Sequence, residues 1–451
     1  MSAIGRRSAK LPKGVTVSSE PQPKGDTRLE YLTEPSLIQT RCLELDTTVP
    51  LPIKLQSDTK FTFTLPSSPS LGLIVSQLML TAELRVVNED LTPLSPEDRR
   101  HFSSANLLLY TMIRRLEIHN DSRYLATLDG YGICEYVRRI TEQDQANLES
   151  TGDIMGFFID SAPREEPSLE GSGQQKRQRK LSAAQPWRLK GPLLLPWFLD
   201  SPQLVISSQA NLAITLMLHG SDYLLWERKA SPEEPQPKPL LLMLTKLSLT
   251  PTYAVYTTEL SRSLRTPFIS RQLITFSGVP GTTVSSSGII SLPSFPSWIT
   301  LFLRPVTMYT QQSNPLAMWP FGAVQLEVLL DGALYSFELE RVENDSAEAN
   351  RRNYSLLNHP GRQMITRSRL RNGWSVFCVP LNLRGVTQPL GNIASSSALT
   401  LSTPTVATPT VLAMKVHFAQ PLIEEVVIQA ILQSNSYLEM DKLGHITFSN
   451  I

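Results

Sequence analysis

The chain has 451 residues, with 42 Lys and Arg against 41 Asp and Glu, so its formal net charge is +1. At roughly 100–200 residues per domain, this length predicts two or three domains with their own cores. Charged residues make up 18% of the chain and hydrophobic ones 41%, which excludes a basic whole-chain nucleic-acid binder and a largely disordered protein. Proline outnumbers glycine, 34 to 22, which is typical of many short strands joined by ordered loops.

Residues 1–36 are predicted to form a flexible basic arm. Up to Leu29 the arm has six basic residues and two acidic ones, with Pro and Ser between them. Its first basic residues, Arg6, Arg7, Lys10 and Lys13, either belong to a solvated tail or contact an anionic partner or a neighbouring subunit. The start MSAIGRRSAKLPKG lacks the apolar region of a secretory signal, so we expect a soluble, intracellular protein.

Residues 37–226 are predicted to form a first β domain. Lys60–Leu65 alternates between polar and apolar residues, and Leu73–Val87 is a long apolar, β-branched run. Ile113–His119 and Tyr124–Leu128 read as two strands of a hairpin. The period of two predicts strands that have one buried face.

One helix is predicted in this domain, over Glu135–Ser150. Val137, Ile140 and the more distant Leu148 fall on one side of it, and the charged residues fall elsewhere. Such a pattern indicates a helix with one apolar side.

Residues 161–186 lose all periodicity and contain the basic run Gln174–Lys180. We interpret this segment as a solvated loop, with a nuclear-import or nucleic-acid patch as the alternative. Strands are predicted to resume at Leu193–Leu199 and Leu204–Leu218.

A change in composition near the midpoint predicts the domain boundary. Glu227–Pro239 holds four prolines and six charged residues, which resist placement inside a sheet because proline lacks the hydrogen-bond donor. We therefore expect a linker over residues 227–239 and a second β domain over residues 240–451.

The second domain is also predicted to consist of strands. Its Asp331-Gly332 pair is a strong hairpin signal, because a type I′ turn needs positive φ at both central residues. The predicted strands are Leu240–Val255, Gln272–Phe276, Ile289–Leu292, Trp298–Leu303, Val324–Leu330, Ala333–Leu339, Trp374–Leu381, Val411–Phe418 and Glu425–Leu432, and Tyr437–Phe448 is predicted to form a last hairpin around Asp441–Gly444. The whole pattern favours an all-β fold of two tandem eight-stranded antiparallel sandwiches with long loops.

Period-two spacing also names residues that should point into the two cores. In the first sandwich they are Phe61, Phe63, Leu84, Val86, Leu116, Ile118, Leu212, Ile214 and Leu216. In the second they are Leu326, Val328, Phe377, Val379, Val416 and Phe418.

The sequence offers little support for catalysis. The six histidines stand alone, and no zinc-hydrolase, nucleophile-elbow or phosphate-loop motif occurs. The three cysteines, Cys42, Cys134 and Cys378, lie far apart without a CxxC pair, and Cys378 has the apolar neighbours of a core thiol.

No run reaches the ~18 apolar residues of a membrane span. We therefore predict no enzyme, no cofactor, no metal site and no transmembrane segment.

The order and spacing of several segments resemble a known family, the double jelly-roll major capsid proteins of polinton-like elements, adintoviruses and adomaviruses, and more distantly adenovirus hexon. The resemblance covers about residues 37–451. Its segments are Ile113–Ser122 followed by Leu128–Tyr136 and the charged helix, Leu247–Val255 followed by Arg265–Phe276, and Leu292–Leu303 followed by Asn314-Pro-Leu and Leu330-Asp-Gly.

This resemblance implies a structural role. It implies homotrimers with six jelly rolls that tile an icosahedral shell, contacts between capsomers, and minor capsid and penton proteins as partners. The arm would face packaged DNA, its core proteins or neighbouring capsomers. The protein would belong to the virion of a DNA virus, made in the host cytoplasm with assembly in the host nucleus.

Two other functions fit an all-β protein of this kind. A carbohydrate-binding sandwich would show exposed aromatic residues, whereas Trp187, Trp197, Trp298, Trp319 and Trp374 mostly lie within or beside apolar runs. An enzyme would need a site assembled from distant loops, which only an activity screen would reveal.

Overall fold

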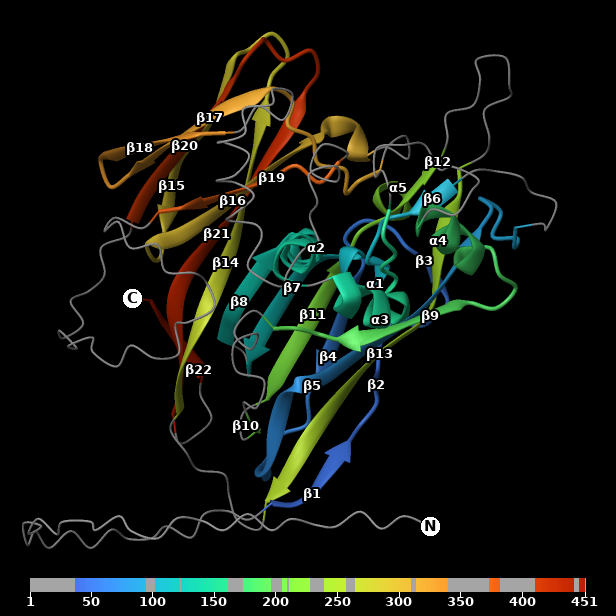
Figure 1. The fold of residues 1–451 in the computed structure, drawn as a ribbon. Helices are drawn as coiled ribbons and strands as arrows, with labels where there is room; N and C mark the ends of the chain where they lie inside the picture. The colour runs from blue at the N-terminus through green and yellow to red at the C-terminus, as the bar shows by residue number, and fades with distance from the viewer. Residues whose placement is uncertain are drawn as a thin grey trace, which may run out of the picture. The chain divides into compact units, whose positions relative to one another are not determined.

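The computed structural model describes residues 37–94, 102–121, 123–143, 145–160, 173–195, 205–208, 211–227, 239–256, 264–309, 314–339, 373–381, 410–441 and 446–450. These residues form two groups of antiparallel sheets, with a few short helices in the first group (Figure 1). The predicted all-β class is confirmed.

The first group holds strands β1 to β13 and five α-helices. The strands are β1 (Leu37–Cys42), β2 (Leu45–Asp46), β3 (Ile53–Lys54), β4 (Lys60–Thr64), β5 (Ser68–Val87), β6 (Phe102–Ser104), β7 (Ile113–Asn120), β8 (Arg123–Asp129), β9 (Trp187–Pro192), β10 (Val205–Ser208), β11 (Leu212–Leu218), β12 (Leu225–Glu227) and β13 (Leu241–Tyr256). The helices are α1 (Leu108–Thr111), α2 (Tyr131–Glu142), α3 (Gln145–Met155), α4 (Gly173–Leu181) and α5 (Ser221–Leu224).

The second group holds nine strands and one 3-10 turn. They are β14 (Leu264–Gly278), β15 (Val284–Leu292), β16 (Pro296–Pro305), η1 (Val306–Tyr309), β17 (Ala323–Leu330), β18 (Ala333–Glu338), β19 (Val376–Pro380), β20 (Thr410–Phe418), β21 (Val426–Met440) and β22 (Ile446–Asn450).

Both groups share one topology. In the second group, the sheets run β14-β21-β16-β19 and β15-β20-β17-β18. Numbered as eight strand positions in chain order, these sheets read 1-8-3-6 and 2-7-4-5. The first group repeats this order. Its sheet β4-β11-β7-β8 reads 2-7-4-5. In its other sheet, β13 and β5 are positions 8 and 3, β1, β2 and β3 together form position 1, and β9 and β10 together form position 6. Each group is therefore a jelly roll of two four-position sheets.

The boundary between the two rolls differs from the predicted one. Strand β13, assigned from the sequence to the second domain, pairs with β1 and with β5 of the first roll. It fills position 8, and without it the first roll would lack the strand that joins positions 1 and 3. The division falls instead between Tyr256 and Leu264, so the Pro-rich segment is a connection within the first roll. Residues 228–238 of that segment lie outside the described residues.

The predicted core is confirmed at every position. All nine residues named for the first sandwich and all six named for the second are buried, none more than 8% exposed. The register explains this result, because Phe63, Ile214 and Ile118 lie opposite one another on neighbouring strands β4, β11 and β7. The Asp331-Gly332 hairpin between β17 and β18 is also confirmed, with φ values of 47° and 83°.

The helical region differs from the single helix that was expected over Glu135–Ser150. Two helices occupy it, because α2 ends at Glu142 with Gln143 in an extended conformation, and α3 starts at Gln145. Val137, Ile140 and Leu148 are buried as predicted. The charges of α2 do not face water, however, and this difference defines the site described below.

The basic run that was interpreted as a solvated loop forms helix α4. Its Arg177 is fully buried, and the guanidinium Nη2 lies 3.0 Å from Asp160 Oδ2. The Arg177 Nε also donates to the carbonyl of Ser104, at 3.1 Å. Burial of an arginine is tolerated when its charge is paired and its donors are used, so this residue serves packing and not an anionic ligand.

Two predicted strands were also misplaced. The sequence predicted a strand at Leu193–Leu199, but the strand in this region, β9, ends at Pro192. Residues 196–204 lie outside the described residues. The strand expected at Leu204–Leu218 is split into β10 and β11, which belong to different sheets. The mostly polar residues between the two apolar stretches, Ser207 to Asn211, mark the place where the chain crosses from one sheet to the other.

Candidate functional site, a charged contact between the two jelly rolls

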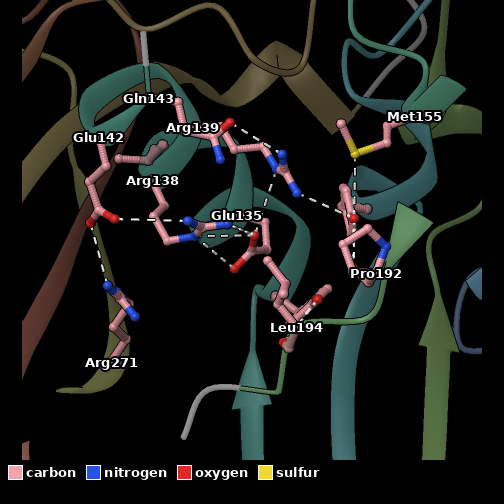
Figure 2. A network of polar contacts seen from close by, with 12 residues as sticks. Glu135, Arg138, Arg139, Glu142, Gln143, Met155, Pro192, Leu194 and Arg271 are labelled. Atoms are coloured by element: carbon pink, nitrogen blue, oxygen red, sulfur yellow. Dashed lines mark hydrogen bonds and ion pairs between the residues drawn. The ribbon is translucent and has the colours of Figure 1, made fainter. Parts of the chain in front are cut away.

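The two rolls meet where the first helix after β8 lies against the first strand of the second roll. Strand β8 lies beside β14 (Figure 1). Arg271 on β14 and Glu142 on α2 form an ion pair, with 3.4 Å between Nη2 and Oε1 (Figure 2). This pair joins side chains that are 129 positions apart in the sequence.

Glu135 is the centre of the charged cluster. It lies on α2 and is only 5% exposed. Arg138 Nη2 donates to its Oε2 at 2.7 Å, and Arg138 Nε lies 3.2 Å from Oε1 (Figure 2). Arg139 Nε lies 3.9 Å from the same Oε2. Residues three and four apart share a helix face, so one turn of α2 presents a carboxylate and two guanidinium groups to the interior.

The arginines keep Glu135 ionised. Burial by itself raises the pKa of this carboxyl group, because it disfavours the charged form. The charges of Arg138, Arg139 and Arg271 and the hydrogen bond from Arg138 more than offset burial, so the pKa lies below its ordinary value. The main contributions come from the two arginines of the same helix, and Arg271 of the second roll adds a smaller one.

Arg139 connects the charged cluster on α2 to Tyr110 on α1. Its Nη2 lies 3.3 Å from the Tyr110 hydroxyl, and its guanidinium carbon lies 4.8 Å from the centre of the Tyr110 ring. The Tyr110 hydroxyl in turn donates to the carbonyl of Pro192 at 2.7 Å. Burial raises the pKa of Tyr110 well above its ordinary value, so the hydroxyl keeps its proton and remains a donor. Helix α2 is thereby tied to α1 and to the end of β9.

Gly130 allows the close approach of the rolls. It caps the N-terminus of α2 with φ of +64°, a conformation that residues with a Cβ rarely adopt. A Cβ at this position would overlap the side chain of Leu273 on β14. Gly130 is therefore needed both for the start of α2 and for the contact between the rolls.

A second polar contact joins the rolls at Arg304 of β16, which is 2% exposed. Its Nη1 lies 3.0 Å from the Tyr223 hydroxyl of α5 and donates to the carbonyl of Pro315 at 2.6 Å. The Tyr223 ring stacks on His219, with 3.9 Å between ring centres. Burial, and then the charges of Arg304 and Arg114, lower the pKa of His219 to about 3. His219 is therefore a neutral packing residue at neutral pH.

Apolar packing continues from one roll to the other. Several buried side chains of the second roll belong to the same contiguous cluster as the core of the first roll. They include Phe268, Phe302, Met318, Trp374, Val376 and Ile431. The charged contact lies beside this apolar packing, with the Arg271 side chain 8% and the Glu142 side chain 34% exposed, so their ion pair is screened less than one between fully exposed groups.

The arm residues named from the sequence, Arg6, Arg7, Lys10 and Lys13, lie outside the described residues. Cys378, expected to be a core thiol, is partly buried and packs against the core, and burial raises its pKa to about 12. Within the described ranges, no cluster of three His, Cys, Asp or Glu side chains suits a metal ion. In the same ranges, no helix is long and apolar enough to cross a membrane.

The sequence did not identify the residues of this contact. Glu135, Arg138 and Arg139 look like the outer face of a surface helix, because a helix pattern does not say what lies opposite its charged side. The available signal was the spacing of a glutamate and two arginines next to a Gly-rich helix start. Arg271 had no comparable signal, since it lies in an ordinary strand.

Comparisons with known proteins identify the fold. No protein-family model and no curated protein sequence matches the chain. A chain in the cryo-EM structure of the Sputnik virophage is similar to it, with a TM-score of 0.63, 10% identity, and coverage of 98% of this chain and 94% of that chain. The mavirus major capsid protein has a TM-score of 0.52 at 10% identity, with 98% and 97% covered.

A chain of the PBCV-1 virus capsid also matches, with a TM-score of 0.52 at 10% identity, covering 94% of this chain and 100% of that chain. The likeness extends over both rolls. The expected fold, that of the double jelly-roll major capsid proteins, is confirmed.

We expect Gly130→Ala to destabilise the protein more than Gly288→Ala. Both glycines have positive φ, but a Cβ at Gly288 would meet nothing within 4 Å, whereas one at Gly130 overlaps Leu273. Gly288→Ala should cost about 1–2 kcal/mol of unfolding free energy through backbone strain. Gly130→Ala should cost about 1–3 kcal/mol more through overpacking. Denaturant unfolding measures both, and equal losses would show that Gly130 is not a contact residue between the rolls.

Glu135→Gln should destabilise the protein and flatten its response to acid. Removing one partner of a buried ion pair costs about 3–5 kcal/mol at neutral pH. Because the pKa of Glu135 is lowered in the folded state, its contribution is present above the unfolded pKa of about 4.3 and is lost as the pH falls through the folded value. Unfolding curves from pH 7 to pH 3 should therefore converge for the two proteins.

The control for this prediction is Glu424→Gln, at an exposed glutamate in a connection of the second roll. We expect its unfolding free energy to stay within about 0.5 kcal/mol of the wild type. Parallel pH profiles for wild type and Glu135→Gln would contradict the assigned role of Glu135.

Proposed function

We propose that this protein is the major capsid protein of a DNA virus and forms hexon-like homotrimeric capsomers that tile an icosahedral shell. The observation that carries the proposal is the tandem pair of jelly rolls fixed to each other by a buried charged contact. Such a chain is a rigid block with two similar halves. The likeness to virus capsid chains over nearly their whole length supports the same role.

The geometry of a two-roll block favours a closed ring. Three copies that contact one another head to tail would arrange six rolls around a threefold axis, a pseudo-hexagonal unit that can tile a surface. A head-to-tail interface produces a ring when its rotation closes. A net charge of +1 limits repulsion between many packed copies, and 34 prolines reduce the entropy that loops lose on assembly.

The aromatic residues favour this function over carbohydrate binding. Trp187 and Trp374 are buried, and Trp298 and Trp319 are half-buried, so none of them offers an open ring for a sugar. Trp197 lies outside the described residues. We further propose that the protein is not an enzyme, because the cluster of charged side chains around Glu135 forms ion pairs within the chain at the contact between the rolls.

The partners follow from the same role. We propose contacts with neighbouring capsomers and with minor capsid and penton proteins in the virion, after synthesis in the host cytoplasm and assembly in the host nucleus. The arm, with Arg6, Arg7, Lys10 and Lys13, would contact packaged DNA or core proteins. Single exposed contacts with phosphate are weak and salt-screened, so the effect would come from many copies together.

The purified chain should form a trimer. Native mass spectrometry should report about 151 kDa, which is three times the chain mass of 50.3 kDa. Electron microscopy of the same sample should show pseudo-hexagonal particles. A chain that stays monomeric at micromolar concentration, with the folded-state circular dichroism spectrum intact, would contradict the proposed function.

Deletion of residues 2–28 should leave trimers intact and reduce the genome content of the particles. The arm lies before the first strand, so its loss should not affect the cores. Particle yield and nucleic-acid content, measured by sedimentation and absorbance, give the result. Trimers that fail to form shells would instead identify the arm as a clip between capsomers, and normal filled particles would exclude both roles.

A further inference from the structure

The outer face of sheet β15-β20-β17-β18 carries a row of apolar side chains. Ile289, Ala413, Leu329 and Leu334 lie opposite one another across the four strands. Ile289 is 82% exposed, Leu334 65% and Leu329 42%. Val411, two residues before Ala413 on β20, is exposed on the same face. We call Ile289, Leu329, Leu334 and Val411 the β18 surface. Exposed apolar patches of this kind mark interaction sites.

The corresponding face of the first roll is polar. There the row across β4, β11, β7 and β8 is formed by Thr62, Thr215, Glu117 and Thr127. Thr62 and Thr215 hydrogen-bond to each other at 3.0 Å. The apolar row is therefore a property of the second roll and not a requirement of the jelly-roll fold.

The charges beside the apolar row are balanced. Glu327 Oε2 lies 3.3 Å from His417 Nε2, and Lys415 lies opposite Glu327 on the neighbouring strand. A face that is apolar and nearly neutral suits another protein surface and not a nucleic acid, which would require an excess of basic groups.

Strand β18 is also an edge. Among the described residues it pairs only with β17, so its other side presents backbone N–H and C=O groups. Its sequence ALYSFE has a single charge and no proline, and it therefore lacks the usual protection of an exposed edge. An edge with an apolar row behind it is suited to docking a strand of another chain.

The contact within the chain indicates which strand that is. In the chain, position 5 of the first roll (β8) lies beside position 1 of the second roll (β14). Position 5 of the second roll is β18, and position 1 of the first roll begins with β1. Strand β1 is exposed over Gln39–Cys42 and, among the described residues, pairs only with β13.

We propose that the β18 surface and the β18 edge dock the β1 edge of the first roll of a second copy, so that position 5 of one roll lies beside position 1 of the next between copies, as β8 lies beside β14 within the chain. This inference rests on the proposed function, since it names the surface that closes the trimer. Four strands about 4.8 Å apart, over about six residues, present roughly 400 Å², about half of the ~800 Å² that each partner buries in a standard interface.

The first test introduces charge into the β18 surface. The double variant Ile289→Lys and Leu334→Lys should lower the trimer fraction at least tenfold in native mass spectrometry, with unchanged circular dichroism and melting temperature. The matched control is Ile154→Lys and Ile423→Lys, two exposed isoleucines outside this sheet, which should leave the trimer intact. A double β18 variant that stays fully trimeric would overturn the inference.

The second test uses Cys42, which is exposed on β1. Cys134 and Cys378 react poorly because burial raises the pKa of each thiol to about 12. Leu334→Cys, treated with a short bismaleimide, should give covalently linked chains, and adding Cys42→Ser should abolish them. Equal cross-linking in the Cys42→Ser background would show that two β18 strands meet each other, which overturns the head-to-tail contact.

Trimer formation and the role of the β18 surface can be tested separately. A trimeric wild type with neither cross-links nor sensitivity to the β18 lysines would overturn this inference alone. A wild type that remains monomeric would overturn the proposed function together with it.

Discussion

The buried carboxylate of Glu135 is the constraint on which the arrangement of this chain depends. An ionised carboxylate in a dry interior is strongly unfavourable unless neighbouring charges and donors compensate it. Arg138 and Arg139 do so from the same helix, and Arg271 contributes from the second roll. Most of the compensation comes from Arg138 and Arg139, and the ion pair between Arg271 and Glu142 joins α2 to β14. That in turn fixes the end of β8 against the second roll.

The two rolls share a topology but are not built alike. In the first roll, position 1 is broken into β1, β2 and β3, and helices occupy the connection between positions 5 and 6. In the second roll, position 1 is the single long strand β14. The helix α2 and the strand β14 lie at the contact between the rolls, whereas β1 and β18 lie at the two remaining ends of the pair. A chain with two different ends is suited to head-to-tail assembly.

Local pattern was sufficient for the core residues that it named, although two of the predicted strands were misplaced. Phe61, Phe63, Leu326 and Val328 were assigned to the cores from period-two alternation alone, because a strand with one buried face leaves that signal in the sequence. The Asp331-Gly332 turn was equally local, since the required positive φ restricts the residue types. The site was not predictable in this way, because Glu135 and Arg138 on a helix look the same whether they face water or another domain.

The sequence by itself determined the β class, the residues of both cores and the tandem arrangement, since each depends on side-chain periodicity along short segments. The tertiary structure decided where one roll ends, because the place of β13 is set by its hydrogen-bonded partners β1 and β5, far away in the chain. It also decided that the charges of α2 and Arg177 are buried. A buried charged side chain needs a partner, and the local pattern does not show whether the helix that carries the charge and its partner is covered by the rest of the fold.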